Sequence, residues 1–243
     1  MPIPIIMLHE VKNRSQESAN SWCISHDKFS ALLDYLYRLN YETITFADIV
    51  SKSALRGSSR KKVVLTFDDG YKHLFDFAIP ELQKRQMKAA FYIPTSCIGK
   101  YNFWDVEKGY EKEEIMNESD LKELDRLGME VGAHSHHHIN LKEAADGRVV
   151  AEEISQSKKI LEVILNKRVY SFAYPYAAVP KEYKKLLSDE GYYYGLSFYQ
   201  PYENKFALRR ICYHNNDTEQ SLRLKLSFPY KILRTLRDPF MDN

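Results

Sequence analysis

Short apolar runs alternate along the chain with longer segments in which apolar residues recur at helical spacing. The runs are bounded by turn residues and predict strands over residues 3–8, 63–67, 89–93, 130–133, 171–174, 192–198 and 207–213. The i, i+3, i+4 spacing predicts helices over residues 26–40, 74–85, 119–127, 146–166 and 181–190. This alternation is typical of repeated β–α units, so we expect a single barrel-like α/β structure.

Polar and turn-forming residues mark the ends of these elements. Ser119 opens the helix predicted over 119–127, Asp120 lies in its first turn, and Gly128 follows its last residue. Segment 51–62 is rich in serine and basic residues, and we predict an exposed loop there rather than a linker, because β–α patterning stands on both sides. We therefore predict one domain over residues 1–243.

The last stretch of the chain, about residues 220–243, interleaves apolar residues with Arg and Lys. A helix with a cationic face could make peripheral contact with a membrane surface. The alternative is a terminal helix packed on the body of the protein with its charges in solvent, because Pro229 interrupts the pattern. Both interpretations describe a basic amphipathic segment.

The composition allows a substantial core and excludes several classes of protein. Hydrophobic residues make up 44% of the 243 residues and charged residues 28%, which excludes a disordered or fibrous chain. The 35 Lys and Arg residues oppose 33 Asp and Glu residues, for a formal net charge of +2. A dedicated nucleic-acid binder carries a stronger basic footprint, so we expect no nucleic-acid partner.

Cysteines and apolar segments bear on the compartment. Cys23, Cys97 and Cys212 are odd in number and far apart, which fits neither a disulfide framework nor a metal knuckle and favours a reducing compartment. The first residues lack the basic region of a signal peptide, and no stretch approaches the roughly 18 apolar residues of a transmembrane span. We expect a soluble, cytoplasmic protein, although a chain trimmed of its leader would look the same. The sequence does not indicate an oligomeric state.

Two adjacent carboxylates follow the strand predicted over 63–67. Asp68 and Asp69 cannot continue a hydrophobic strand, and Gly70 allows a turn that points both side chains into one cleft. Folds of the α/β class place their active sites at such strand ends. Adjacent ionised carboxylates repel, so the site needs a cation or a raised pKa. The alternative is an ordinary Asp-Asp-Gly turn that needs no metal.

A second polar cluster, His134, His136, His137 and His138, follows the strand predicted over 130–133. Imidazole is the commonest metal ligand near neutral pH. Two imidazoles and one carboxylate leave an open coordination position, as in catalytic rather than structural zinc sites. A solvated histidine loop is the alternative. Because this cluster and TFDDG occur in one chain, we predict a divalent metal site.

The ordered motifs TFDDG, HSHHH and FAYPYA resemble those of the NodB-like polysaccharide deacetylases, carbohydrate esterase family four, over most of the chain. TFDDG matches in full, and the family's His-Ser/Thr-x-x-His fits His134 and His138. The resemblance implies a distorted (β/α) barrel in which Asp69, His134 and His138 hold one divalent metal, usually zinc (Zn), with Co, Ni, Mn or Fe as alternatives. It also implies that Asp68 is the general base, because a carboxylate beside the metal can take a proton from the attacking water.

The motif FAYPYA would contribute to substrate binding. The resemblance implies that the backbone N–H of Tyr176 donates to the oxyanion of the tetrahedral intermediate. Pro175 would fix the local backbone, and the Tyr176 ring would offer a surface for sugar.

The chain departs from the family at this third motif, which is often Arg-x-Pro-Tyr/Phe-Gly. Ala173 stands where the arginine belongs and Ala177 where the glycine belongs. Relatives of the FAYPY form share this lack and carry a late arginine on a strand, which matches Arg210. We hypothesise that Arg210 pairs with Asp68; the alternative is that Arg209 and Arg210 are surface charges on an edge strand.

The family's general acid is a histidine in a closing Leu-x-His motif, and no such motif follows Tyr176. A branch that resembles the poly-N-acetylglucosamine deacetylases is circularly permuted and supplies this histidine from its first strand. His9 fits that position, and we favour it over His214 as the acid that protonates the leaving amine. The alternative for either side chain is a histidine satisfied by ordinary hydrogen bonds.

Trp104 is the most suggestive of the many aromatic residues. It follows the loop after the strand predicted over 89–93 and should hang over the active face, where sugars stack on flat rings. The alternatives are substrate contact and a buried anchor.

These residues predict a metal-dependent hydrolase that removes acetyl groups from N-acetylated amino sugars in a polysaccharide, oligosaccharide or glycolipid precursor and releases acetate. An O-acetyl esterase or another non-peptide amide hydrolase would use nearly the same chemistry. A catalytically inactive glycan-binding domain is the third alternative, although binding alone would not require Asp68. The acetylated saccharide is the expected partner.

Overall fold

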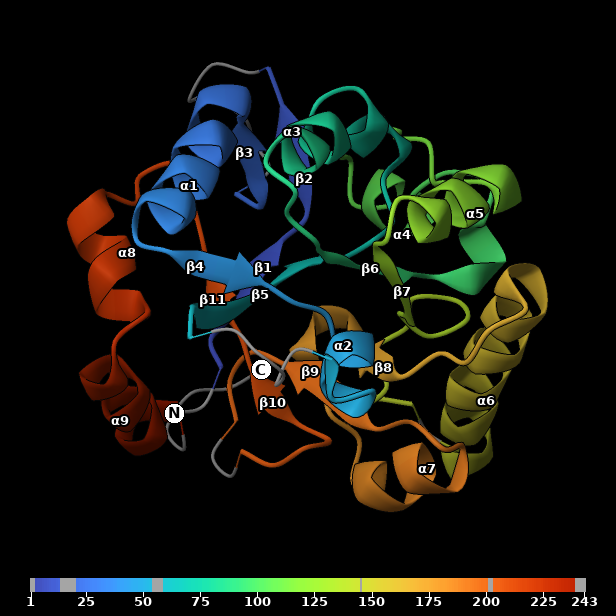
Figure 1. Cartoon of the computed structure of the whole chain (residues 1–243). Coiled ribbons are helices and arrows are strands. Elements are labelled where there is room, and N and C mark those ends of the chain that lie inside the picture. The colour runs from blue at the N-terminus through green and yellow to red at the C-terminus, as the bar shows by residue number, and fades with distance from the viewer. Residues whose placement is uncertain (1–2, 14–20, 54–58, 145, 201–202, 239–243) are drawn as a thin grey trace.

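A parallel sheet forms the centre of the structure and rolls into a nearly closed barrel surrounded by helices (Figure 1). The computed structural model describes residues 3–13, 21–53, 59–144, 146–200 and 203–238. The sheet runs in the order β10–β9–β8–β7–β6–β5–β1–β11, with parallel pairing throughout. Its strands, each close to a predicted one, are β1 (Ile5–Leu8), β5 (Lys61–Phe67), β6 (Ala90–Ile93), β7 (Glu130–Ala133), β8 (Ser171–Ala173), β9 (Tyr194–Ser197), β10 (Leu208–Arg209) and β11 (Ile211–Cys212).

The two edges of the barrel sheet meet at a single residue. Only Arg210 separates β10 from β11 in sequence, yet β10 pairs with β9 while β11 pairs with β1 at the opposite edge. The one strand predicted over 207–213 is therefore wrong. The chain changes its hydrogen-bonding partner half-way along, which the apolar pattern does not reveal.

Short elements that the periodicity did not predict complete the sheets. β4 (Tyr41–Thr43) pairs with the first residues of β5, and β2 (Glu10–Lys12) pairs with β3 (Cys23–Ser25) in a separate two-stranded sheet. Each of these strands has only 3 residues, too few to show a period of two.

Helices flank the barrel strands, and four of the predicted helices are confirmed with small shifts at their ends. The segment predicted as one helix over 74–85 is instead a 3₁₀ turn followed by α3, because Phe77, with φ −144°, interrupts the helical backbone. The helices are α1 (His26–Arg38), α2 (Phe46–Val50), α3 (Ala78–Lys84), α4 (Phe103–Val106), α5 (Glu118–Arg126), α6 (Gly147–Leu165), α7 (Tyr183–Asp189), α8 (Glu219–Lys225) and α9 (Phe228–Arg237), with 3₁₀ turns η2 (Lys72–Phe75), η3 (Thr95–Cys97) and η4 (Pro175–Ala177).

The start of α5 and the serine-rich segment refine two further predictions. Asn117 rather than Ser119 caps α5, and its side chain and that of Asp120 form a reciprocal capping box. Within the segment predicted as an exposed loop, Ser51–Ser53 and Ser59–Lys61 are exposed and Lys61 already begins β5, while residues 54–58 lie outside the described residues. None of the helices in the described ranges combines the length and apolar character that a membrane span requires.

Alternate residues of the barrel strands face two separate apolar cores. On β5, Val63 and Leu65 belong to the large core that also contains residues of the flanking helices, whereas Val64 belongs to a smaller core. On β1, Ile6 lies in the large core and Ile5 in the smaller one. Members of the smaller core come from β1, β5, β6, β8 and β9, so it fills the inside of the barrel.

Candidate active site

The same alternation carries titratable side chains into the barrel at the C-terminal ends of its strands, which we call the barrel mouth. Asp68 continues the inward-facing series of Val64 on β5, and His9 continues that of Ile5 on β1. His134 follows β7. The last residue of β7 lies in the large core outside the barrel, so the next side chain, that of His134, points into the barrel. Three strands thus deliver three polar groups to one place, as the sequence motifs predicted.

A tight turn adds the second carboxylate. Asp69 and Gly70 have φ angles of +71° and +68°, and a Cβ at Gly70 would lie 2.7 Å from Cδ1 of Ile93. Glycine is therefore required at position 70 for both backbone conformation and space. The turn leaves Asp68 2% and Asp69 7% exposed. Both carboxylates are therefore buried, unlike those of an ordinary Asp-Asp-Gly turn in solvent, which was the alternative left open by the sequence.

The loop after β7 folds back so that its first and last histidines approach Asp69. His134 Nε2 lies 3.4 Å and His138 Nε2 3.1 Å from Oδ1 of Asp69. The Nδ1 atom of His134 lies 2.8 Å from the carbonyl of Ala173, and the Oγ of Ser135 accepts from the backbone N–H of His138. A donating Nδ1–H leaves Nε2 of His134 as the atom available to a ligand.

Asp69, His134 and His138 are all buried, and their ligand atoms lie within 4.8 Å of one another. Burial opposes ionisation of Asp69, but hydrogen bonds to both imidazoles hold the pKa of its carboxyl well below the usual range. Burial lowers the pKa of His138, whereas in His134 it is outweighed by Asp69, which raises the pKa of that imidazole. One ionised carboxylate between two imidazoles is a donor set that fits a divalent metal.

The other two histidines of HSHHH face away from this group. Nδ1 of His136 lies 2.8 Å from the hydroxyl of Thr95, and Nδ1 of His137 lies 2.6 Å from the carboxylate of Glu153 on α6. The same carboxylate accepts the backbone N–H groups of His136 and His137. Glu153 therefore fixes the loop that carries both candidate ligands. Its signal in the sequence is an acid on the apolar face of a helix, which the sequence analysis missed.

Asp68 does not contact this ligand group but forms a two-pronged ion pair with Arg210. The two guanidinium nitrogens donate to its two oxygens at 2.6 and 2.7 Å, and Arg210 is 1% exposed. Burial alone would raise the pKa of Asp68, but the charge of Arg210 lowers it. The pair predicted from the sequence is therefore present, and Arg210 is not a surface charge.

His9 and His214 occupy different positions relative to Asp68. Nε2 of His9 lies 3.9 Å from Oδ2 of Asp68, and burial lowers the pKa of the imidazole. The Trp22 ring packs against His9 at 4.9 Å and against His214 at 5.7 Å between ring centroids. Nδ1 of His214 lies 3.2 Å from the carbonyl of Ser21. Only His9 of these two histidines has a contact with Asp68 among those described.

Of the three predicted substrate contacts, only Tyr176 has an exposed side chain. Trp104 is 5% exposed and stacks on His138 with centroids 4.0 Å apart, so it is the buried anchor and its prediction as a sugar platform is wrong. Pro175 is also buried, and it opens η4. Tyr176 is 44% exposed, has φ +55°, contacts the edge of His138, and lies under the ammonium of Lys108.

Trp22 is an exposed aromatic that the sequence analysis missed. It is 40% exposed and packs against His9, just as Tyr176 packs against His138. The sequence around Trp22 does not mark it as a site residue, because the preceding residues 14–20 are polar and show no apolar periodicity in sequence.

Comparison with known protein families identifies the family of this chain. A family model described as polysaccharide deacetylase matches residues 56–195, more than half of the chain. The chain belongs to the polysaccharide deacetylase family. Members of this family generally depend on a metal, and Asp69, His134 and His138 form a possible metal site in this member. The FAYPY sub-branch stays a prediction.

Similar proteins extend the match beyond the family model. The chain is 25% identical over 233 residues to the poly-β-1,6-N-acetyl-D-glucosamine N-deacetylase of Staphylococcus aureus (strain MRSA252). This match covers 88% of this chain and 73% of that protein. It is 25% identical over 196 residues to YxkH of Bacillus subtilis (strain 168), named for the same family, and the match covers 80% of this chain but only 64% of YxkH. The Streptococcus pyogenes deacetylase PplD, solved in complex with acetate, shares the fold with a TM-score of 0.77 at 24% identity, over 93% of this chain and 98% of that one.

Proposed function

We propose that this polysaccharide deacetylase is a divalent-metal-dependent N-deacetylase that removes acetyl groups from N-acetylated amino sugars in a polysaccharide, oligosaccharide or glycolipid precursor. The observation that carries the proposal is the placement of a buried, ionised Asp68 between Arg210 and His9, beside the Asp69, His134 and His138 group. The acetylated saccharide is the partner that the family supports, and the N-deacetylase named among the relatives agrees with it.

The ion assigned to Asp69, His134 and His138 is zinc, because two imidazoles and a carboxylate suit it; Co, Ni, Mn and Fe are the alternatives. When bound, such an ion supplies Lewis-acid polarisation of the acetyl carbonyl and activation of water. Burial of all three side chains and the hydrogen bond from His134 to the Ala173 carbonyl hold the ligand group before the ion arrives.

Asp68 and His9 act as the proton-transfer pair. Arg210 keeps Asp68 ionised, so its carboxylate accepts a proton from water as the nucleophile attacks. His9 takes this proton from Asp68, whose Oδ2 lies 3.9 Å from its Nε2, and delivers it to the leaving amine, so that no proton is gained or lost. Burial of the imidazole lowers its pKa, which makes the protonated form a stronger acid.

The exposed aromatic at the barrel mouth binds the sugar. Tyr176 presents a half-exposed ring beside His138, and Lys108 over that ring adds a donor for hydroxyl groups. The backbone N–H of Tyr176 is assigned to the oxyanion, since its left-handed backbone conformation sets this peptide apart from a regular turn.

The first test measures bound divalent metal by elemental analysis in the wild type and in single alanine variants. We expect about one metal per chain, lost in His134→Ala and Asp69→Ala but kept in His136→Ala, the matched control from the same loop. Metal-free wild-type protein after addition of zinc or cobalt would contradict the assignment.

The second test measures acetate release from N-acetylated and O-acetylated saccharides. We expect release from the N-acetylated set and a loss of about 100-fold or more in Asp68→Asn, with metal content unchanged. Release from O-acetylated substrates alone would identify an esterase instead. Metal binding without release from either set would indicate a glycan-binding domain. The compartment stays a prediction.

A further inference from the structure

The last helix, α9, presents its apolar face to solvent and buries one of its cations, Arg234, against the barrel. Phe228, Ile232 and Leu236, spaced four residues apart, are 59%, 48% and 67% exposed, and Leu233 beside them is 50% exposed. These four residues, the α9 ridge, occupy one side of the helix. Arg234 on the opposite side is only 3% exposed. The sequence-based alternative of a packed helix with solvated charges therefore has the orientation reversed.

Specific contacts fix this orientation. Arg234 donates to the carboxylate of Asp238 at 2.7 Å, to the carbonyl of Phe198 at 2.6 Å and to the carbonyl of Arg210 at 3.2 Å. A buried guanidinium with these acceptors cannot turn outward without leaving carbonyls and a carboxylate unpaired. The outward position of the ridge is thus a consequence of the fold and not of a loosely attached helix end.

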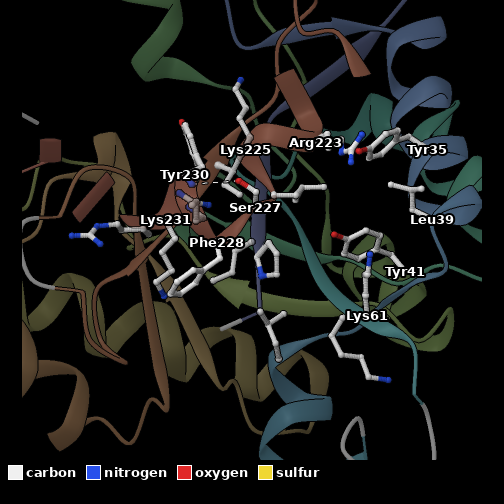
Figure 2. Close-up of a pocket in the computed structure, with 18 of the residues that line it drawn as sticks. Tyr35, Leu39, Tyr41, Lys61, Arg223, Lys225, Ser227, Phe228, Tyr230 and Lys231 are labelled. Atoms are coloured by element: carbon white, nitrogen blue, oxygen red, sulfur yellow. Dashed lines mark hydrogen bonds between the residues drawn. The ribbon is translucent and has the colours of Figure 1, made fainter. Parts of the chain in front are cut away.

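A cavity of about 860 Å³ adjoins the helix at the N-terminal ends of the strands (Figure 2). Its walls bring Phe228 and Leu226 from the α8–α9 segment together with Leu39 and Tyr41 from the α1–β4 segment. The cavity is therefore largely apolar, and it opens beside one end of the ridge, since Phe228 belongs to both.

Cationic side chains border the same region. Lys61, at the start of β5, and Arg223, on α8, both line the cavity and are exposed, and no carboxylate partner is described for either, since Glu203 and Glu219 in the same lining pair with Lys231 and Arg38. Lys61 instead lies over the Tyr41 ring at 5.6 Å. Lys231 and Arg237 flank the ridge on α9, with side chains 37% and 41% exposed, but they pair with Glu203 at 2.8 Å and Asp238 at 3.8 Å, so the excess positive charge of this border lies on Lys61 and Arg223. An apolar ridge within a cationic border matches a surface with acyl chains beneath anionic headgroups.

We propose that the α9 ridge and its cationic border dock the enzyme onto a membrane that contains anionic phospholipid. The ridge enters the interface, and Lys61 and Arg223 contact the headgroups. Because Lys61 begins β5 and Asp68 follows its end, the docking face and the barrel mouth lie at opposite ends of a strand of 7 residues, about 20 Å apart. The mouth therefore faces away from the lipid, toward a glycan.

Sedimentation of the full chain with vesicles tests this proposal independently of deacetylase activity. We expect binding to vesicles that contain about 30% phosphatidylglycerol in phosphatidylcholine. The double variant Ile232→Ser/Leu236→Ser should weaken it about tenfold or more, because it removes two large exposed apolar side chains. The matched control is Val163→Ser, which removes an apolar side chain that is 81% exposed on α6 and should leave binding unchanged.

A second variant separates the cationic contribution. Lys61→Gln/Arg223→Gln should reduce binding to these vesicles by about fivefold per cation at low salt, and the loss should shrink near 0.5 M NaCl because salt screens exposed charges. Absence of binding in the wild type, or equal binding by the ridge variant, would overturn the proposal. So would a dimer in analytical ultracentrifugation that the ridge variant dissociates, since a second copy would then cover the face.

Discussion

Two buried arginines meet at the seam between β10 and β11, and their comparison shows what makes one of them functional. At the mouth, Arg210 gives both prongs of its guanidinium to Asp68, whose carboxylate also faces His9. Arg234, which reaches the same seam from α9, gives its donors to Asp238 and to the carbonyls of Phe198 and Arg210. Both arginines are almost fully buried. A buried arginine therefore indicates chemistry only through what its partner touches.

The two arginines also show that strands and helices fix the direction of a side chain in different ways. Arg210 lies between two strands whose ladders hold it, so its direction follows from backbone pairing. Arg234 lies on a helix whose rotation no ladder fixes, so its direction depends on the side-chain contacts alone. The consequence is that loss of Arg210 should change the reaction, whereas loss of Arg234 should change only how α9 is attached.

The largest expected effect comes from Arg210→Met. The change leaves Asp68 as a buried carboxylate without its cation, so the pKa of that carboxyl rises and the general base is protonated near neutral pH. We expect kcat/KM to fall by about 100-fold or more and the free energy of unfolding to fall by about 3–5 kcal/mol. Acetate release and chemical denaturation measure the two effects.

A second variant separates charge from stability at this pair. Asp68→Asn/Arg210→Met removes both charges and should recover much of the lost unfolding free energy while remaining inactive. Recovery of activity in the double variant would contradict the assignment of Asp68 as base.

Arg234→Met sharpens the comparison from the α9 side of the seam. We expect the unfolding free energy to fall by about 2 kcal/mol, because the buried carbonyls of Phe198 and Arg210 lose their donor, whereas Arg209 at 3.1 Å and Arg237 at 3.8 Å still face the carboxylate of Asp238. The value of kcat/KM should stay within about threefold of the wild type under conditions where the variant is folded. Arg234 contacts Arg210 through its backbone carbonyl, whereas the pair with Asp68 is made by the Arg210 side chain. A loss of activity as large as that of Arg210→Met would erase the distinction between the two arginines.

The smallest expected effect is on the pH dependence of the unfolding free energy, through His73. This imidazole has no bidentate ion pair like that of Arg210 and Asp68 among the contacts described. Burial lowers the pKa of His73 from its ordinary value of 6.5 to about 4. The folded protein therefore binds fewer protons than the unfolded chain between these values, and stability falls as the pH drops from about 6.5 to about 4. Between pH 7 and pH 5 this group should cost about 2 kcal/mol.

His73→Gln measures that cost directly. The difference in unfolding free energy between pH 7 and pH 5 should be about 2 kcal/mol smaller in the variant than in the wild type. An identical pH dependence in the two proteins would mean that the carboxylate of Glu113, 3.4 Å from Nδ1, keeps the imidazole charged in the folded state.

The residues that the sequence predicted best are those whose position follows from strand alternation. Asp68, His9 and His134 stand at strand ends in step with inward-facing neighbours, and a period of two is enough to place them. The pairing of Arg210 with Asp68 came from family resemblance instead. Apolar pattern alone describes residues 207–213 as one strand and hides the change of partner at Arg210.

Side chains on irregular segments were less predictable. The loop before Trp104 was expected to hold the ring over the active face, but the ring packs on His138, and this contact depends on a backbone path that no periodicity encodes. The apolar spacing of α9 was visible, but its direction was not, because amphipathicity tells which residues share a face and not which face meets the protein. That direction depends on Arg234 finding carbonyl acceptors far away in sequence.

The change of partner at Arg210 also governs the width of the barrel. No ladder joins β10 to β11 within the described residues, so the last gap in the circumference is spanned by one residue and by the side chains that cross it. Arg210 spans it through Ser197 on one side and through Thr66 and Asp68 on the other. Its side-chain length thus acts as a spacer between β9 and β5 across the seam. A shorter residue here would leave the carbonyl of Ser197 or the carboxylate of Asp68 without its contact across the seam.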